Sequence, residues 1–440
     1  MASEPGTDWR AGLAQVEITP EHPTRMGGYG ARTALSEGVH DPLTAKALAL
    51  ANFGGAPAVL ITMDLIGVDA DYATAVTAVI AAKTGVPRER VIINSSHTHG
   101  GPIFGIRYPS VYGLVGAELA ASKAYSEGLE AKLVRLVHHA LADLQPARLA
   151  WDIGSGSVSF AMNRRKFTAV GVENAPNPRG YVDRTVPVLR VAAADGSLRG
   201  VVFGYSCHNT TLGATNLLFT SDYAGYAQRF VEAHCHGAQA MFVQGFGADA
   251  NPYPRGTFEL ACRHGEALGE EVVRVLTQAE LRDVEGTLQI AFDHVDLPLE
   301  PAPNAAELAA LRRRGSYYRG VADRIQALLD SGKPWASCYG TPVALWQVGA
   351  ELTFVRLSGE VVGDYVRLLE EALGPLGLWP LGYGADYHGY LPSSRVHAEG
   401  GYEARDFITG YGYLSTEVEA AVLAKVRDLA VRVGRLPART

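Results

Sequence analysis

The sequence predicts an α/β (mixed α+β) fold in which layered mixed sheets carry flanking helices. Apolar, β-branched runs alternate with stretches of helical periodicity, and several of the runs end in polar loops that contain glycine. With 47% hydrophobic and 19% charged residues, the 440-residue chain can bury a large core. We expect a single domain over residues 1–440, with a candidate sub-domain boundary near 299–304, where prolines separate a strand from a helix.

The first half of the chain shows this alternation clearly. The expected elements are, in order, strands at 45–52 and 58–63, a helix at 70–82, a strand at 91–94, a helix at 117–142 and a strand at 148–153. Two β-branched runs, 186–192 and 198–205, are joined by Ala-Asp-Gly-Ser, which is typical of a hairpin.

The second half continues with mixed elements. We expect a helix at 223–233, a strand at 240–246, a helix at 258–278, a hairpin of strands at 343–348 and 352–357, and a C-terminal helix at 416–433. Asn304 can cap a helix with Glu307 three residues on. The helical pattern at 305–330 could cover an active-site mouth or form a subunit contact in a homo-oligomer.

Charge and cysteine content exclude several classes of protein. The formal net charge of -7 is spread without long runs, which disfavours nucleic acid as a partner. No apolar run approaches the length of a transmembrane segment, and residues 1–10 lack the pattern of an export signal. The four cysteines form no CxxC pair, so neither a disulfide framework nor a thiolate zinc site is indicated. These observations predict a cytoplasmic protein.

Unusual polar residues stand where four predicted strands end. His97 and His99 follow one strand, and His208, Asp249 and Glu360 follow three others. In sheet enzymes ligands and catalytic groups gather at strand ends. Two imidazoles and a carboxylate form the ligand set of a catalytic zinc site, at which water is activated and a carbonyl polarised. The pattern favours metal-assisted hydrolysis, although any one of these histidines could be structural.

Several segments resemble, in order, those of the neutral, non-lysosomal ceramidases. Asn-Ser-Ser-His-Thr-His-Gly-Gly-Pro at 94–102 is similar to the family's Thr-His-Thr-His-Ser-Gly-Pro. Further similar segments are Val-Glu-Ile-Thr-Pro at 16–20, Met-Gly-Gly-Tyr at 26–29, Asn-Arg at 163–164, Cys-His-Asn-Thr at 207–210, Thr-Ser-Asp-Tyr-Ala-Gly-Tyr at 220–226, Ser-Gly-Glu at 358–360 and Asp-Tyr-His-Gly-Tyr at 386–390. The resemblance implies a neutral-ceramidase-like catalytic domain.

Carried over to this sequence, the resemblance implies a Zn²⁺ held by His97, His208, Glu360 and Tyr390, with Tyr387 close enough in sequence to compete with Tyr390. It implies that His99 and Arg164 bind the substrate carbonyl or the developing oxyanion. Asp64 and Asp222 are candidates for orienting the ligands, or they could cap helices.

Two departures from the family bear on chemistry and substrate. Gly245 stands where the family has a serine in Gln-Ser-Asn-x-Gly-Asp, which the resemblance connects with nucleophilic attack. We therefore expect direct attack by zinc-bound hydroxide, with His99 or Asp249 assisting proton transfer. The chain length leaves no room for the family's immunoglobulin-like domain. Together with the N-terminus, this favours as substrate a linear N-acyl or other small amide, or a lipid-like amide, over ceramide.

Two alternatives to this metal-dependent amidohydrolase remain open. The same zinc site could catalyse amide formation or acyl transfer, because it would stabilise the same tetrahedral intermediate. Alternatively, the protein is a non-catalytic relative that keeps the pocket and binds ligands only.

Overall fold

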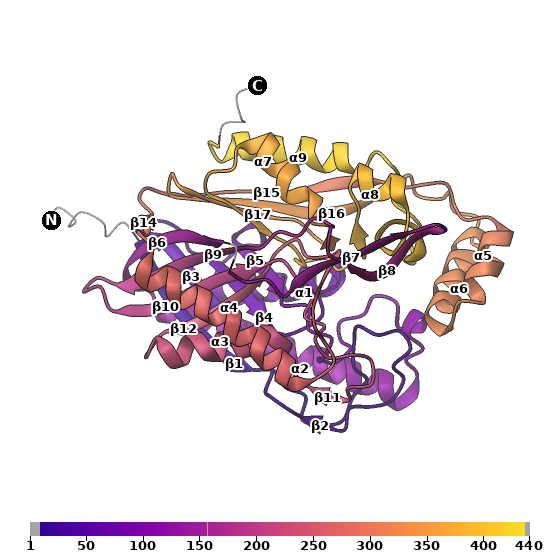
Figure 1. Ribbon diagram of the computed structural model, residues 1–440, viewed down its shortest axis with the longest axis horizontal. Coiled ribbons are helices and arrows are strands. Elements are labelled where there is room, and N and C mark those ends of the chain that lie inside the picture. Colours follow the sequence, from indigo (N-terminus) through magenta and orange to yellow (C-terminus); the bar gives the residue numbers. More distant parts are fainter. Residues whose placement is uncertain (1–8, 156, 436–440) are drawn as a thin grey trace.

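The computed structural model describes residues 9–155 and 157–435, and its largest element is a nine-stranded mixed sheet (Figure 1). Residues 1–8 lie outside the described residues, and the expectation that residues 1–10 lack an export signal falls mostly on them. In spatial order the strands are β12 (Gln239–Gln244), β10 (Leu198–Tyr205), β9 (Thr185–Ala193), β6 (Gln145–Ser155), β1 (Trp9–Glu17), β3 (Thr44–Asn52), β4 (Ala58–Met63) and β5 (Val91–Ser95), with β14 (Arg282–Asp283) beside β6. The pairs β10–β12 and β4–β5 are parallel, and the other pairs are antiparallel.

The two edges of this sheet meet. The Asn94 side chain on β5 accepts a hydrogen bond from the backbone N–H of Gln244 on β12 at 2.8 Å and donates one to the backbone carbonyl of Gln244 at 3.0 Å. It also donates to the Gly382 carbonyl at 2.7 Å. Loops that follow β5, β10 and β12 are thereby brought to one place.

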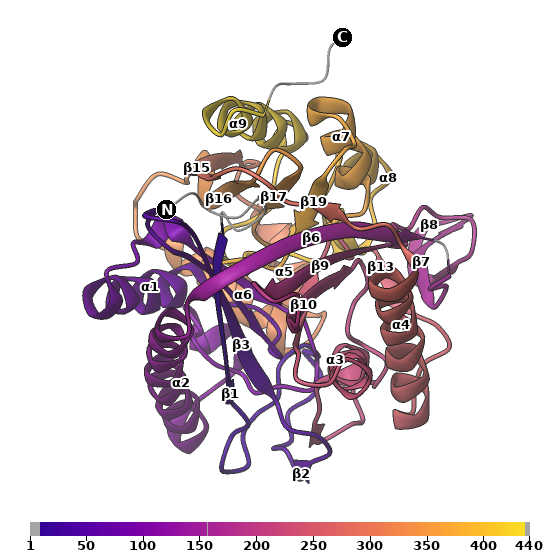
Figure 2. The same cartoon turned by 90° about the vertical axis from the view of Figure 1, so that its left-hand side faces the viewer.

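A second sheet packs on the first (Figure 2). It contains β15 (Leu288–Pro298), β16 (Cys338–Val348), β17 (Leu352–Arg356) and β19 (Leu378–Leu381). Trp346 and Trp379 of this sheet share a buried cluster with Trp9 of the main sheet. The outer face is covered by α7 (Asp364–Leu373) and α9 (Val418–Arg432).

Two helix pairs cover the main sheet. The pair α1 (Ala70–Thr84) and α2 (Gly116–Ala142) packs against β3, β4 and β5. The pair α3 (Asp222–His234) and α4 (Phe258–Gln278) packs against β9, β10 and β12, on the opposite side in Figure 2. The apolar faces of all these elements are buried, so the alternation of strands and helices read from the sequence is explained by layered packing.

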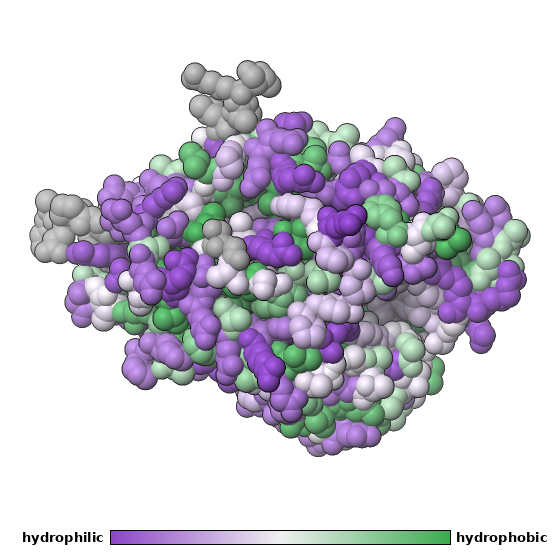
Figure 3. All heavy atoms as spheres, viewed as in Figure 1, coloured by the Kyte–Doolittle hydropathy of each residue, from purple (hydrophilic) through white to green (hydrophobic). Residues whose placement is uncertain are grey.

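Smaller elements surround the strand ends. They are the three-stranded sheet of β7 (Ala161–Thr168), β8 (Gly171–Asn177) and β13 (Ala250–Pro252), the pairs β2 (Gly38–Val39) with β11 (Leu218–Phe219) and β18 (Glu360–Val361) with β20 (Tyr390–Leu391), helices α5 (Ala305–Arg312), α6 (Ser316–Asp330) and α8 (Ser394–Glu399), 3-10 turns at Arg88–Arg90 and Pro109–Tyr112, and a π-helical turn at Tyr402–Asp406. Hydrophilic and hydrophobic residues are interspersed over the face seen in Figure 3.

The mixed α/β fold class and the predicted helices are confirmed. The five helices expected at 70–82, 117–142, 223–233, 258–278 and 416–433 are α1, α2, α3, α4 and α9, and their ends differ by at most two residues. The helical pattern at 305–330 is broken into α5 and α6 at Gly315, whose φ of 124° no other residue type adopts readily. Asn304 and Glu307 form the expected capping box.

The segment near 299–304 is the loop that leads from β15 to α5, and a domain boundary there stays a prediction. All four cysteines are unpaired. Within residues 9–155 and 157–435, no helix has both the length and the apolar composition that crossing a bilayer requires.

Candidate active site

Three histidines meet beside the joined edges of the main sheet. His97 and His99 follow β5, and His208 follows β10. A parallel bridge between Thr98 and Asn209 ties the two loops together, and the His99 amide donates to the Asn209 carbonyl at 3.3 Å. The expectation that strand ends gather the polar residues therefore holds for these imidazoles.

His97 has an unusual backbone conformation. Its φ of 62° lies in the left-handed region, which costs free energy for a residue with a side chain. The backbone is held there by a hydrogen bond from its amide to the Leu65 carbonyl at 2.9 Å. The imidazole is fixed by a 2.6 Å contact between its Nδ1 and the Ile66 carbonyl oxygen. Strain of this kind concentrates at functional sites.

The imidazole nitrogens converge on one point together with a carboxylate. His97, His99 and His208 each offer a nitrogen, and the three atoms lie within 4.8 Å of one another. His97 Nε2 and His99 Nε2 are 3.2 Å apart, and Glu360 Oε2 lies 3.0 Å from His208 Nε2 and 3.4 Å from His97 Nε2. Ligand atoms bound tetrahedrally at about 2.0–2.1 Å from one metal ion stand about 3.3 Å apart. The spacing therefore fits a metal ion.

The positions of the protons support the same interpretation. The Nδ1 atoms of His97 and His208 face carbonyl oxygens at 2.6 and 2.8 Å, so each carries the proton and leaves a lone pair on Nε2. Burial and the charge of Arg164 lower the pKa of His208 to about 4. Lone pairs on two imidazoles then face a carboxylate oxygen, an arrangement that a bound cation stabilises.

Two tyrosines near Glu360 differ in their contacts. The Tyr387 hydroxyl donates to Glu360 Oε1 at 2.8 Å. Tyr390 is the register partner of Glu360 in the β18–β20 pair, but its hydroxyl accepts a hydrogen bond from Arg164 Nη2 at 2.9 Å. Tyr390 as a metal ligand stays a prediction, and Tyr387 is the tyrosine that contacts Glu360.

Arg164 lies beside the imidazoles in a fixed orientation. Its Nη1 is 3.3 Å from His208 Nε2 and donates to Asn251 Oδ1 at 3.3 Å. Its Nε donates to Glu403 Oε1 at 2.8 Å, and the other oxygen of Glu403 accepts from Arg165 at 2.6 Å. Because four groups fix this guanidinium, its positive charge is presented at one edge of the cluster.

The predicted aspartates have structural contacts. Asp249 accepts hydrogen bonds from the Asn163 side chain at 3.0 Å and from the Gly363 amide at 2.8 Å, and burial raises its pKa. Asp64 accepts from the amide and hydroxyl of Thr44 at 2.9 and 2.7 Å. These hydrogen bonds hold neighbouring segments together, and the catalytic role of Asp249 and the orienting role of Asp64 stay predictions.

Asp222 stands at the start of α3 with a φ of 53°. Its carboxylate accepts hydrogen bonds from the amides of Leu212 at 3.1 Å and Tyr223 at 2.7 Å. The carboxylate thus fixes the loop that follows His208 and Asn209, and any effect on the imidazoles would pass through this loop.

Position 245 lies against Ser206. A side chain on Gly245 would meet the hydroxyl of Ser206, which donates to Asp183 at 2.8 Å. The effect of a glycine in place of the family's serine, and the direct attack by zinc-bound hydroxide expected from it, stay predictions. The segment that follows β12 reaches the site through the Gly247 carbonyl, which lies 2.8 Å from His208 Nδ1. It also reaches the site through Asn251, which contacts Arg164 and the Thr210 hydroxyl at 3.3 Å.

Sequence reasoning missed three further residues of the site. The Tyr29 ring lies 4.7 Å from the His99 ring, and the Tyr383 ring lies 4.4 Å from the His97 ring. The Tyr383 hydroxyl is buried without a hydrogen-bond partner among the described residues. Glu403 lies on the π-helical turn, where no motif signals it. Only Tyr29 had a signal, its place in the Met-Gly-Gly-Tyr segment.

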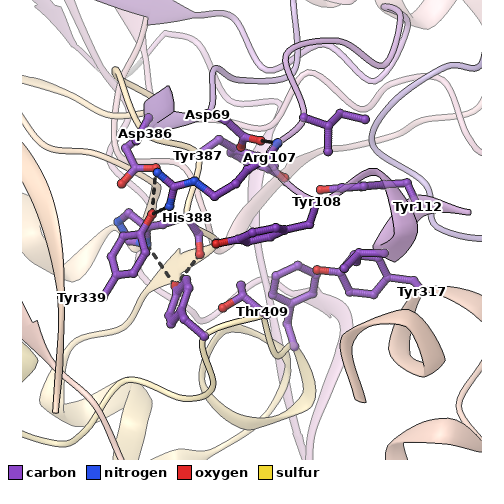
Figure 4. Close-up of a pocket in the computed structure, with 17 residues that line it drawn as sticks. Asp69, Arg107, Tyr108, Tyr112, Tyr317, Tyr339, Asp386, Tyr387, His388 and Thr409 are labelled. Carbon is purple, nitrogen blue, oxygen red and sulfur yellow. Dashed lines mark hydrogen bonds between the residues drawn. The ribbon is translucent and has the colours of Figure 1, made fainter. Parts of the chain in front are cut away.

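A cavity of about 500 Å³ borders the cluster. Its wall includes Gly28, which packs on the His99 ring, and Tyr387. Residues from the junction of α5 and α6 also line this cavity. Whether the segment covers an active-site mouth or forms a subunit contact stays a prediction. A smaller cavity of about 60 Å³ adjoins it, and Figure 4 shows Tyr112, Tyr317 and Tyr387, which line both.

Comparison with known proteins places the chain in one family. The model of the neutral/alkaline non-lysosomal ceramidase N-terminal domain matches residues 9–273. The chain is 30% identical over 247 residues to the neutral ceramidase of Pseudomonas aeruginosa and 25% identical over 278 residues to neutral ceramidase A of Dictyostelium discoideum. These matches cover 54% and 59% of the chain, but only 35% and 38% of the two relatives.

Solved structures show the same fold. The crystal structure of neutral ceramidase from Pseudomonas aeruginosa superposes with a TM-score of 0.74 and 22% identity, covering 99% of this chain and 76% of that one. A ceramidase complexed with C2 gives a TM-score of 0.76 at 20% identity, with the same coverage. Since the family model spans more than half of the sequence, the chain belongs to the neutral/alkaline non-lysosomal ceramidase family.

Proposed function

We propose that the protein is a zinc-dependent hydrolase of a linear C–N amide bond in an N-acyl or other small amide. The observation that carries the proposal is the convergence of three imidazoles, whose ligand nitrogens lie within 4.8 Å of one another, on Glu360. The Glu360 Oε2 atom lies 3.0 Å from His208 Nε2 and 3.4 Å from His97 Nε2. Support also comes from the family, whose members act on ceramide, itself an N-acyl amide.

The donor set suits zinc, because imidazole nitrogen and carboxylate oxygen are its usual ligands at catalytic sites. His97, His208 and Glu360 would hold the ion, with Tyr387 orienting Glu360 through its 2.8 Å hydrogen bond. When bound, zinc supplies a Lewis acid that polarises the amide carbonyl and makes water a nucleophile near neutral pH.

His99 differs from the other two imidazoles in a way that suits proton transfer. It is half-buried, whereas His97 and His208 are fully buried. Its Nδ1 has no hydrogen-bond partner among the described residues, so no carbonyl fixes its tautomer. We infer that His99 carries a proton to the leaving nitrogen of the amide, which must be protonated as the C–N bond breaks.

Arg164 would stabilise the charge that develops on the carbonyl oxygen. Its guanidinium is held by Glu403, Tyr390 and Asn251 before any substrate arrives, so no reorganisation is needed during the reaction. Preorganised donors of this kind contribute about 10²–10³-fold to rate.

The test combines metal content with turnover. The purified protein is analysed for bound metals, stripped with a chelator and reloaded with zinc, and amide hydrolysis is measured on short N-acyl amides and on a ceramide. We expect activity that depends on zinc and is lost with His208→Ala. His234→Ala is the control, because His234 is exposed on α3.

Each alternative has its own outcome. Equal activity with and without metal, or an unaffected His208→Ala variant, would contradict the proposal. Binding of an amide without release of product from zinc-loaded protein would identify a ligand-binding relative. Amide formed from acid and amine, without hydrolysis, would identify an acyl-transfer enzyme.

A further inference from the structure

The large cavity beside the site has an aromatic wall and a buried cation. Its volume of about 500 Å³ is that of a pocket for one drug-sized ligand. Apolar and aromatic side chains dominate the lining, including Phe104, Tyr112, Tyr317 and Phe407. Arg32 lines the same cavity and is only 5% exposed.

Arg32 lies next to the candidate catalytic histidine. Its Nη2 donates to the backbone carbonyl of His99 at 2.6 Å and also to that of Gly27, and its Nη1 donates to the carbonyl of Asn216 at 3.0 Å. The guanidinium also lies 5.2 Å from the centre of the Tyr29 ring, which contacts the His99 ring. A group bound by Arg32 would therefore lie close to the bond under attack.

The hydrogen-bonding capacity of Arg32 is only partly used. A guanidinium has five N–H donors. Three of them reach backbone carbonyls, and the buried Nε has no partner among the described residues. The carbonyls explain why the side chain is held in position, but they leave its positive charge without an opposite charge.

Acidic side chains do not supply that charge. No carboxylate of residues 9–155 or 157–435 forms an ion pair with Arg32, whereas Arg25 in the same wall pairs with Glu118 at 3.0 Å. Asp69 is the acidic residue among those that line the cavity, and its carboxylate accepts the amide of Arg107 at 2.7 Å. A buried charge without a partner is costly, and an anionic ligand would remove that cost.

We propose that Arg32 binds a carboxylate of the substrate, and that the substrate class is therefore the N-acyl amino acids, with the acyl chain in the aromatic part of the cavity. The inference rests on the proposed function. Hydrolysis would consume one water, break the C–N bond and release a fatty acid and an amino acid, whose nitrogen receives the proton. Arg314, at the junction of α5 and α6, adds a second guanidinium to the same wall.

The experiment compares two substrates that differ in one charge. Zinc-loaded protein is given N-decanoylglycine or N-decanoylglycinamide, and decanoate release is measured. A hydrogen bond to a charged group corresponds to about 10–100-fold, so we expect kcat/KM for N-decanoylglycine to be higher by that factor, mainly through KM. In Arg32→Gln the ratio falls toward one, and in Arg32→Lys it is partly kept.

Arg312→Gln is the control, because Arg312 of α5 forms an exposed pair with Asp323 of α6 and does not line the cavity. It should keep the wild-type ratio. If the Arg32 variants fail to fold, the wild-type ratio alone decides, and a ratio of one or a preference for the neutral amide overturns the proposal.

Binding separates this inference from the proposed function. In metal-stripped wild-type protein, N-decanoylglycine should raise the melting temperature and N-decanoylglycinamide should do so less. If neither compound is hydrolysed but this difference in binding is seen, the proposed hydrolysis fails and the assignment of Arg32 stands. If both are hydrolysed equally and bind equally, the hydrolase is supported and the assignment of Arg32 is overturned.

Discussion

Gly28 offers a sharp test of the position of His99. Gly28 has a φ of 95°, and a Cβ at this position would lie 2.8 Å from the His99 Cβ and closer still to its ring. Carbon atoms in contact are about 3.5–4.0 Å apart, so Gly28→Ala must displace the imidazole by about 1 Å. A displacement of that size at a catalytic group costs about 10²-fold in rate. We expect kcat to fall by that factor.

The backbone conformation contributes separately and needs its own control. A side chain at positive φ costs about 1–2 kcal/mol in stability. Gly196 has a φ of 88° in the β9–β10 hairpin, and a Cβ there meets nothing within 4 Å. Gly196→Ala should therefore lose similar stability and keep full activity, which isolates the effect of the contact with His99.

The assay measures amide hydrolysis at saturating substrate, zinc content and thermal unfolding for both variants. Loss of activity in Gly28→Ala with zinc still bound would place the effect on His99 rather than on the ligands. Wild-type kcat in a folded Gly28→Ala variant would refute the argument that the position of His99 governs the reaction.

Three further predictions follow from individual contacts. Tyr387→Phe should weaken zinc binding by about 10–100-fold, because Glu360 loses a hydrogen bond of 2.8 Å. Chelator competition measures this affinity, and an unchanged affinity would contradict the role of Tyr387. Glu403→Gln should lower the free energy of unfolding by about 3–5 kcal/mol in denaturant titrations, because two buried arginines lose their shared carboxylate. A loss below about 1 kcal/mol, the value typical of an exposed ion pair, would contradict this prediction. Burial raises the pKa of Asp69 to about 7, above its value in the unfolded chain. The buried carboxyl group is therefore tolerated in its protonated form at low pH, and the stability of the folded protein falls as pH rises from about 4 to 7 and the group ionises. Asp69→Asn should therefore gain up to about 4 kcal/mol relative to wild type at pH 8 but not at pH 4, and parallel stability profiles would contradict this.

The sequence was sufficient for the parts of the site that follow strands. His97, His99 and His208 could be predicted to meet because apolar β-branched runs end directly before them, and strand ends lie at the edge of a layer. The helices could be predicted closely because their apolar periodicity reflects one buried face. The break at Gly315 was missed because apolar spacing continues across it.

The groups supplied by tertiary contacts could not be predicted in this way. Glu403 reaches Arg164 from a π-helical turn more than 200 positions along the chain, and Ile66 holds His97 through a backbone carbonyl that any residue could offer. The contact of Tyr387 with Glu360 depends on the pairing of two short strands, β18 and β20, that carry no clear periodicity.

The closure of the main sheet through Asn94 has a consequence for how the protein folds. Strands β5 and β12 are far apart in the chain, so their junction forms only after long loops have closed, and folds dominated by such contacts assemble slowly. The proposed metal site lies at this junction, and its carboxylate, Glu360, comes from β18, which follows both strands in the chain. Metal uptake should therefore be a late event in refolding, and the rate at which the protein acquires its ion would report on the final joining of the sheet.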